Sequence, residues 1–279
     1  MVKHTHKFLI SLLYLGVYLK SREVLVHRPG KELKIVTLPQ RWLFNDYIDP
    51  VEMEREHDKL VKALQDQGVT VHYLTRSMDN KPKLYMVRDN AVISDRKAVT
   101  CHSIYSVRRG EEQIVKMRLK ELGVKIAGHI FVPGFLQGSD IFFMDKNHAI
   151  AIIGRETNKQ AIEHLMNMLK IDVIPMEMEN LTNTKFNLVN DTAVISEDLT
   201  YGPLFDLLKE REYDIVIATS EQTRNMAVNF IQIDDYRIVN VKSDLNEKLK
   251  MIGYDVIELE LRELLKGNCG IRGLVLPFY

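Results

Sequence analysis

The sequence predicts an α/β fold, a five-fold pseudosymmetric α/β propeller of ββαβ modules around a central pocket. Short β-rich apolar runs alternate with amphipathic helices, the pattern recurs about every 40 to 55 residues, and no Ser/Gly-rich linker interrupts it. A repeat of this length closes a ring or stacks a solenoid, and a ring places one pocket on its axis. We therefore expect one domain over 20–279, preceded by an apolar extension over 1–19.

Each element follows from a local signal. Apolar residues at helical spacing define the long helices, Gly68, Gly123 and Gly253 end three of them, and β-branched runs bounded by polar turns define the strands. In chain order we expect strand 23–27, helix 51–67 and strand 69–74; strand 91–94, helix 111–122 and strand 125–131; strands 141–144 and 149–153, helix 159–169 and strand 172–175; strands 186–189 and 192–195, helix 201–211 and strand 214–218; strands 228–233 and 237–241, helix 243–251 and strand 255–259.

An open doubly wound sheet is the alternative, because it also alternates strands and helices. The short polar turns over 144–148 and 234–236 indicate antiparallel hairpins, which such a parallel sheet lacks. No glycine-rich phosphate loop follows any of the expected strands. Both observations favour the propeller.

Charge and cysteine usage exclude several functional classes. The 38 Lys and Arg residues balance the 38 Asp and Glu residues, so no net field attracts nucleic acid or an anionic membrane surface. The two cysteines, Cys101 and Cys269, stand in no metal-ligand or redox spacing. We therefore expect no nucleic-acid or membrane partner, no structural metal and a reducing, cytoplasmic location.

The N-terminus imitates a signal peptide, with a basic start over 1–7 and an apolar run over 8–19. The run ends in charged residues without a small-x-small cleavage site, and it is shorter than the roughly 20 residues that span a bilayer. We expect an extension that is buried or lies upstream of the domain rather than an export signal.

Seven segments in chain order resemble motifs of bacterial arginine deiminases: 21–30 (SREVLVHRPG), 84–90 (LYMVRDN), 107–112 (VRRGEE), 136–140 (LQGSD), 154–158 (GRETN), 186–189 (FNLV) and 267–278 (GNCGIRGLVLPF). Over nearly its whole length the chain is thus similar to the arginine deiminase and amidinotransferase superfamily, the penteins. The resemblance implies the five-fold propeller. It also implies metal-free and cofactor-free chemistry at the guanidino carbon of arginine or its relatives, through a covalent thiol intermediate.

That chemistry requires a thiolate nucleophile, carboxylates that hold a guanidinium, and a histidine that moves protons. By the resemblance, the nucleophile position falls on Gly273, the histidine on Asn187 and the catalytic glutamate on Gln137. A family aspartate falls on Val189, and only the first carboxylate is kept, as Asp89. Glycine cannot attack and an amide does not titrate in the useful range. The replacements favour a pseudoenzyme.

Several residues carry two interpretations. Cys269 is either a loop thiol without a base or a displaced nucleophile. Asp89 is either a ligand contact or a structural acid, and Asp140 favours a structural turn after a glycine and a serine. Arg108 and Arg109, followed by acidic residues, are typical of a solvated helix entry.

The expected ligand contacts are the side chains at the family's site positions, namely Asp89, Gln137, Asp140, Asn187 and Arg272. The family arginine that grips a substrate carboxylate falls on Glu156, with Arg155 one place earlier. Amides in place of charged groups keep hydrogen bonding and lower the charge. We expect a small amino-acid-like or guanidino-like ligand that is less cationic than arginine, or a regulatory or interaction role. The alternatives are a hydrolase that cleaves a guanidino C–N bond with Cys269 and a protein that binds a large assembly.

Overall fold

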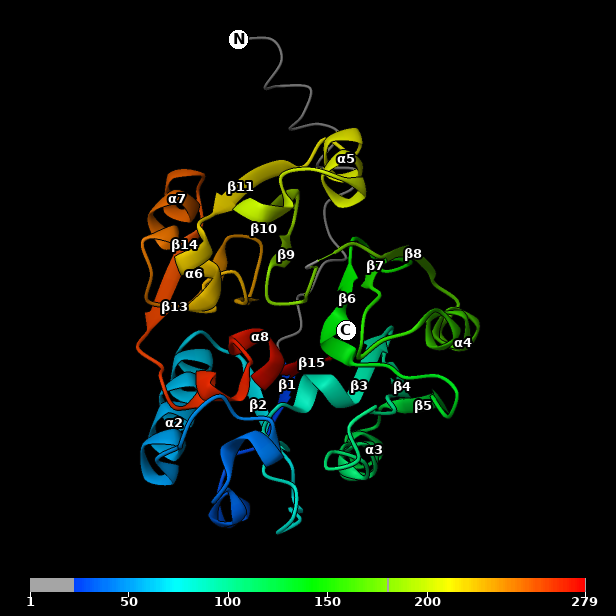
Figure 1. The fold of residues 1–279 in the computed structure, drawn as a ribbon, viewed down its shortest axis with the longest axis vertical. Coiled ribbons are helices and arrows are strands. Elements are labelled where there is room, and N and C mark those ends of the chain that lie inside the picture. Colours follow the sequence, from blue (N-terminus) through cyan, green and yellow to red (C-terminus); the bar gives the residue numbers. More distant parts are fainter. Residues whose placement is uncertain (1–22, 180, 279) are drawn as a thin grey trace.

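Five three-stranded sheets form a ring in the computed structural model, which describes residues 23–179 and 181–278. Figure 1 shows the sheets around a common centre, with the longer helices on the outside. The predicted α/β propeller is confirmed. The extension over 1–19 lies outside the described residues. Within the described part of the chain, no helix is long and apolar enough to cross a membrane.

The five sheets share one pairing pattern, in which the middle strand is antiparallel to one neighbour and parallel to the other. In pairing order the strands are β15 (Leu276–Pro277), β1 (Glu23–Val26) and β2 (Thr70–Tyr73); β3 (Ala91–Ser94), β4 (Lys97–Thr100) and β5 (Lys125–His129); β6 (Ile141–Phe143), β7 (His148–Ile152) and β8 (Asp172–Met176); β9 (Phe186–Val189), β10 (Thr192–Ser196) and β11 (Asp214–Ala218); β12 (Ile231–Gln232), β13 (Arg237–Val241) and β14 (Asp255–Leu259).

A helix connects the parallel pair in each sheet, because parallel neighbours need a long crossover. These connecting helices are α2 (Pro50–Asp66), α3 (Glu111–Glu121), α4 (Lys159–Leu169), α5 (Pro203–Glu210) and α7 (Leu245–Met251). The shorter helices are α6 (Ser220–Arg224), α8 (Ile271–Leu274) and the 3-10 turns η1 (Lys31–Ile35), η2 (Pro39–Trp42), η3 (Val87–Asn90), η4 (Gly138–Asp140), η5 (Glu197–Leu199) and η6 (Leu264–Gly267).

The chain closes the ring by a pairing that the sequence did not predict. Strand β15, near the C-terminus, lies antiparallel to β1, with Leu276 opposite Leu25 and Pro277 opposite Val24. The first module therefore takes its third strand from the other end of the chain. A two-residue strand has no periodicity to detect, and its partner is more than 200 residues away in sequence.

Helix α2 begins and packs as its local sequence signals predict. The side chain of Asp49 caps it by accepting hydrogen bonds from the backbone N–H groups of Val51 and Glu52, at 2.9 and 3.1 Å. Pro50 occupies the first turn, where its missing N–H costs nothing. The apolar face of α2, which includes the buried Leu60, packs in the same core as β1. This packing fixes the first module against the rest of the ring.

One buried histidine on α2 gives the fold a pH dependence. His57 is fully buried, and neither ring nitrogen has a hydrogen-bond partner among the described residues. Burial, with a smaller contribution from the charge of His27, lowers its pKa from 6.5 to about 3. The folded state thus disfavours the protonated ring. The contribution of the neutral His57 ring to the free energy of unfolding is fully present above pH 6.5. It falls by up to about 1.4 kcal/mol per pH unit as the pH drops towards 3.

We expect His57→Leu to reduce this loss, because leucine has no ring to protonate. Thermal unfolding measured between about pH 7 and about pH 5 checks it. His148→Leu is the control, since this exposed histidine bonds to the carboxylate of Asp145. Equal pH dependence in the wild-type protein and His57→Leu would contradict the assignment.

Candidate functional site

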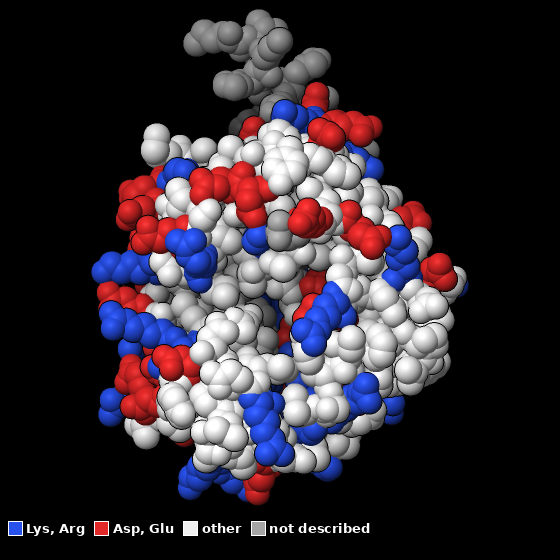
Figure 2. All heavy atoms as spheres, in the orientation of Figure 1, with Lys and Arg blue, Asp and Glu red and all other residues white. Residues whose placement is uncertain are grey.

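A pocket of about 530 Å³ lies where several modules meet, which is within the usual size of small-molecule sites. Figure 2 shows the surface hollowed near the centre of this face, with acidic and basic side chains at the hollow. The pocket is lined by Gln40, Leu43, Phe44, Lys83, Met86, Tyr105, Arg108, Gln137, Asp140, Ile152, Gly154, Arg155, Glu156, Leu181, Thr182, Asn183, Thr184, Met226, Gly267 and Asn268.

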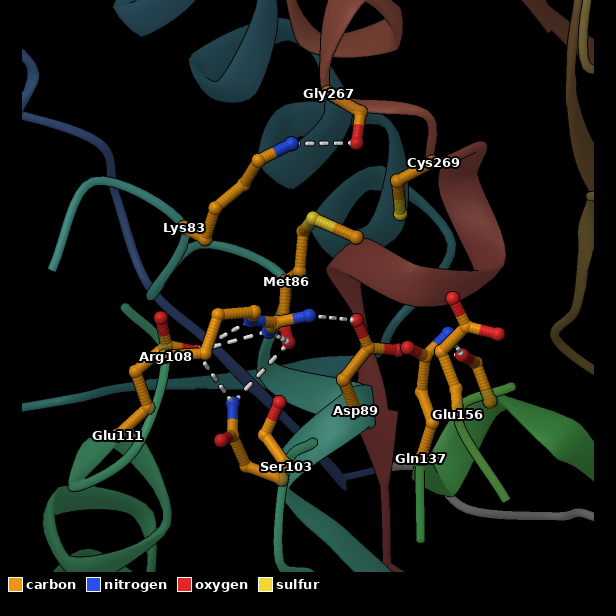
Figure 3. Close-up of polar contacts among 12 residues, drawn as sticks. Lys83, Met86, Asp89, Ser103, Arg108, Glu111, Gln137, Glu156, Gly267 and Cys269 are labelled. Atoms are coloured by element: carbon orange, nitrogen blue, oxygen red, sulfur yellow. Dashed lines mark hydrogen bonds and ion pairs between the residues drawn. The ribbon is translucent and has the colours of Figure 1, made fainter. Parts of the chain in front are cut away.

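Arg108 is a buried cation beside the pocket, and the predicted solvated helix entry is wrong for it. Its Nη1 donates to Asp89 Oδ2 at 2.6 Å, and its Nη2 donates to Glu111 Oε2 at 2.8 Å (Figure 3). Burial lowers the pKa of the guanidinium, but the charges of Glu111 and Asp89 outweigh it and hold that pKa above its ordinary value. Arg109, the next residue, is exposed as predicted.

Asp89 lines a small neighbouring cavity rather than the main pocket. Its carboxylate lines a small cavity of about 10 Å³, which shares Arg108, Gln137 and Glu156 with the main pocket. Arg108 bonds to one carboxylate oxygen, and the hydroxyl of Ser139 donates to the other. Both carboxylate oxygens of Asp89 therefore already accept hydrogen bonds from side chains of this protein.

Gln137 directly precedes η4, Asp140 is the last residue of η4, and both line the main pocket. The amide of Gln137 donates to Ser139 Oγ at 3.0 Å. Asp140 accepts hydrogen bonds from Thr157 at 2.5 Å and from Asn183 at 2.6 Å. Burial nevertheless raises the pKa of Asp140 to about 7, so its carboxyl carries less than a full negative charge at neutral pH.

Lys83 is a buried lysine in the pocket wall that the sequence motifs did not single out. Its Nζ donates to the carbonyl of Gly267 at 2.6 Å (Figure 3). The same nitrogen lies 4.0 Å from the ring centroid of Phe44. Burial and the nearby charge of Arg108 lower its pKa to about 7. It stands one residue before the segment 84–90, but only the fold shows that it is buried.

Gly273, at the family's nucleophile position, lies in α8 behind the thiol of Cys269. A Cβ built at Gly273 would lie 2.1 Å from Cys269 Sγ. The sulfur therefore fills the space where a side chain at position 273 would begin. Cys269 does not line the main pocket, its thiol donates to the carbonyl of Gly270 at 3.1 Å, and burial followed by the charge of Asp89 raises its pKa.

We expect both cysteines to resist alkylation in the folded protein. Cys101 and Cys269 are buried, and burial raises both thiol pKa values, so few thiolates exist at neutral pH. Iodoacetamide should modify neither thiol in buffer and both in denaturant, as read by intact mass. Rapid stoichiometric modification of the folded protein that disappears in Cys269→Ala would contradict this.

Asn187 and Arg272 are not brought to the main pocket. The amide of Asn187 donates to the carbonyls of Val228 and Phe230, both at 3.0 Å. Arg272 lies 3.9 Å above the ring of Phe142 and donates to backbone carbonyls, among them that of Ile141 at 2.6 Å. Both line a separate cavity of about 30 Å³. Their polar atoms tie neighbouring modules together, and their predicted ligand contacts would require this second cavity.

Arg155 and Glu156 both line the main pocket, so a cation remains beside the acidic residue at this end. The guanidinium of Arg155 lies 5.3 Å from the ring centroid of Tyr105, and the Tyr105 hydroxyl donates to the carboxylate of Glu156. The positive charge of Arg155 therefore offsets the negative charge that Glu156 brings to this end of the pocket.

The described wall of the main pocket offers hydrogen-bond donors, hydrogen-bond acceptors and charged groups. Among residues 23–179 and 181–278, no histidine lines the pocket, and neither does Cys269. In residues 23–179 and 181–278, no group of three or more His, Cys, Asp or Glu side chains could hold a metal ion. The described residues of the pocket wall thus present neither an imidazole nor a thiol.

Comparison with known proteins places this geometry in a family. The family model described as N,N dimethylarginine dimethylhydrolase, eukaryotic, matches residues 51–278. The uncharacterized protein YkgA of Bacillus subtilis is 22% identical over 250 residues, covering 87% of this chain and 86% of its own. An arginine deiminase of Listeria innocua is 25% identical over 195 residues, which cover 69% of this chain and 42% of the enzyme.

Solved structures share the fold. A DDAH from Pseudomonas aeruginosa, a mutant complexed with citrulline, superposes with a TM-score of 0.79 at 19% identity over 92% of this chain and 98% of its own. The N-terminal domain of ArgZ, an arginine dihydrolase from cyanobacteria, gives a TM-score of 0.80 at 17% identity over 92% and 97%. The chain belongs to the N,N dimethylarginine dimethylhydrolase family of the pentein superfamily.

Proposed function

We propose that this chain binds a small molecule in the main pocket without cleaving it, and that the ligand is less cationic than arginine. The observation that carries the proposal is the composition of the pocket wall, where the described part of the chain places neither a histidine nor the thiol of Cys269. Loss of a nucleophile and its base lowers turnover by factors as large as about 10⁶ in covalent enzymes. Binding is the function that the remaining groups support.

The preference for a less cationic ligand follows from the charges around the pocket. Asp89 is covered by Arg108 and Ser139, and Asp140 is partly neutral because burial raises its pKa to about 7. Gln137 stands where the family has a glutamate, and Lys83 adds a buried amine. Citrulline is the first probe, because its side chain is an uncharged counterpart of a guanidinium and a DDAH neighbour was solved with it.

We expect Gln137→Glu to raise the affinity for arginine by at least about tenfold. Two unit charges about 4 Å apart attract by about 4 kcal/mol at an effective dielectric of about 20, before desolvation is subtracted. Calorimetric titration of arginine and citrulline into both proteins measures the change. Gln40→Glu is the matched control, since it adds the same charge to an exposed residue of the pocket rim. Tight, stoichiometric binding of arginine to the wild-type protein would contradict the proposal.

A hydrolase that uses Cys269 is the second candidate. It is favoured by one observation, that the Cys269 sulfur fills the space where the side chain of the family nucleophile would begin. Such an enzyme would need the thiol to move into the pocket and lose its proton. Product release from arginine that is lost in Cys269→Ala would establish it.

A further inference from the structure

The buried amine of Lys83 contacts a backbone carbonyl and an aromatic ring rather than a carboxylate. Its Nζ bonds to one backbone carbonyl and lies over one aromatic ring, and no carboxylate in the described part of the chain forms an ion pair with it. The contact with Gly267 is specific, because a Cβ at that glycine would lie 2.9 Å from Nζ and 1.8 Å from the hydroxyl of Tyr85. The surroundings thus hold a buried amine at the wall of a pocket, and the nearby carboxylates of Asp89 and Glu111 form no ion pair with it.

The chemical state of this amine is unusual for lysine. Burial and the charge of Arg108 lower its pKa to about 7, so about half of it is free amine at neutral pH. An ordinary lysine has a free-amine fraction smaller by roughly a thousandfold at this pH. Desolvation and a neighbouring cation are the two ways in which proteins prepare a lysine for Schiff-base chemistry.

Arg155, another cation in the pocket wall, indicates that the ligand carries an acidic group. The guanidinium of Arg155 lines the same pocket, and no carboxylate among residues 23–179 and 181–278 forms an ion pair with it. A guanidinium binds a carboxylate through parallel hydrogen bonds. An amine that can condense and a cation that can hold an acid fit one class of small molecule, a 2-oxo acid.

We propose that Lys83 forms a Schiff base with a small 2-oxo acid held in the main pocket, an inference that rests on the proposed binding function. The Lys83 nitrogen attacks the carbonyl carbon, and a C–N bond forms while the C=O bond becomes C–OH. The two hydrogens of the amine leave with the carbonyl oxygen as water, and the imine nitrogen takes up a proton from solvent. No oxidant, reductant or metal is required, and hydrolysis reverses the reaction.

Reductive trapping tests the proposal on the whole folded protein. The protein is incubated with pyruvate and cyanoborohydride near pH 7, and intact mass and peptide mapping are then recorded. We expect one adduct, equal in mass to pyruvic acid less one oxygen atom, on Lys83. It should be at least about tenfold less abundant in Lys83→Arg, which keeps the cation but offers no free amine at this pH. Lys81→Arg is the control, because Lys81 is buried nearby, bonds to the carbonyl of Val107 and does not line the pocket.

Lys83→Met is a second variant in case arginine does not fit, and circular dichroism confirms that each variant is folded. Absence of the adduct, or equal labelling of exposed lysines, would overturn the Schiff base whether or not pyruvate binds. A shift in thermal unfolding with lactate, which has no carbonyl, reports reversible binding separately. If lactate or citrulline stabilises the protein but pyruvate leaves no adduct, only the Lys83 inference fails. Turnover of arginine would instead remove the binding function itself.

Discussion

Replacing Arg108 by methionine is expected to lower the free energy of unfolding by about 3 to 5 kcal/mol at pH 7. The methionine fills most of the volume but leaves the buried carboxylates of Asp89 and Glu111 without their cation. Burial already raises the pKa of Glu111 although Arg108 is present. Urea unfolding measures the loss, and Arg109→Met is the control because Arg109 is exposed and bonds to backbone carbonyls.

The same variant has a pH dependence of defined sign. Burial raises the pKa of Glu111 in the folded protein, and the charge of Arg108 opposes this rise, so removing Arg108 raises that pKa further. The variant is therefore more stable when the Glu111 carboxyl is protonated, and this stability is lost as the pH rises through the raised pKa. The deficit relative to wild type should therefore be smaller near pH 5 than at pH 7. A deficit equal to that of Arg109→Met at every pH would show that the buried ion pairs do not contribute.

Replacing Gly138 by alanine is expected to cost about 1 to 3 kcal/mol or more, because it overpacks two backbone segments. The added Cβ would lie 2.2 Å from the carbonyl oxygen of Arg88 and 2.6 Å from that of Ala91. Both atoms belong to the backbone, so no side-chain rotation relieves the contact. The shift would separate η3, which carries Asp89, from η4.

Gly154→Ala is the matched control, since Gly154 lines the same pocket but its added Cβ would meet nothing within 4 Å. Thermal unfolding and citrulline titration of both variants are the measurements. We expect Gly138→Ala to lose stability and binding, and Gly154→Ala to keep its stability. Comparable melting temperatures for the two variants would contradict the packing of η3 against η4.

The repeat was predictable because each module carries its own signals, with period-two strands and helices that end at glycine. Strand β4, which follows β3 after the tight turn at Asp95 and Arg96, was not predicted from the sequence. This strand has only four residues and directly follows charged turn residues, so it shows no apolar run of its own. The pairing of β15 with β1 was missed because no local pattern reports a contact between the two ends of a chain. Local chemistry predicted the modules, and tertiary contacts decided how they close.

The site was predictable in part. The motifs identified the segments that meet at the ring centre. Gln137 and Asp140 do line one pocket, and Asp89 lines the small cavity that shares residues with it. Their role as ligand contacts stays a prediction. Arg108 was misjudged because a run of arginines before glutamates is usually solvated, whereas here the turn faces inward. Lys83 could not be found, because burial and not sequence sets its chemistry.

Citrulline release from arginine and from N,N-dimethylarginine decides most directly whether this chain binds or cleaves. Protein in amounts comparable to substrate is incubated for hours, so that even a few turnovers are detected, and Cys269→Ala is assayed in parallel. We predict no citrulline above the buffer control from either protein, together with saturable binding of citrulline to both. Citrulline release by the wild-type protein that is abolished in Cys269→Ala would contradict the binding function and establish a displaced thiol catalyst.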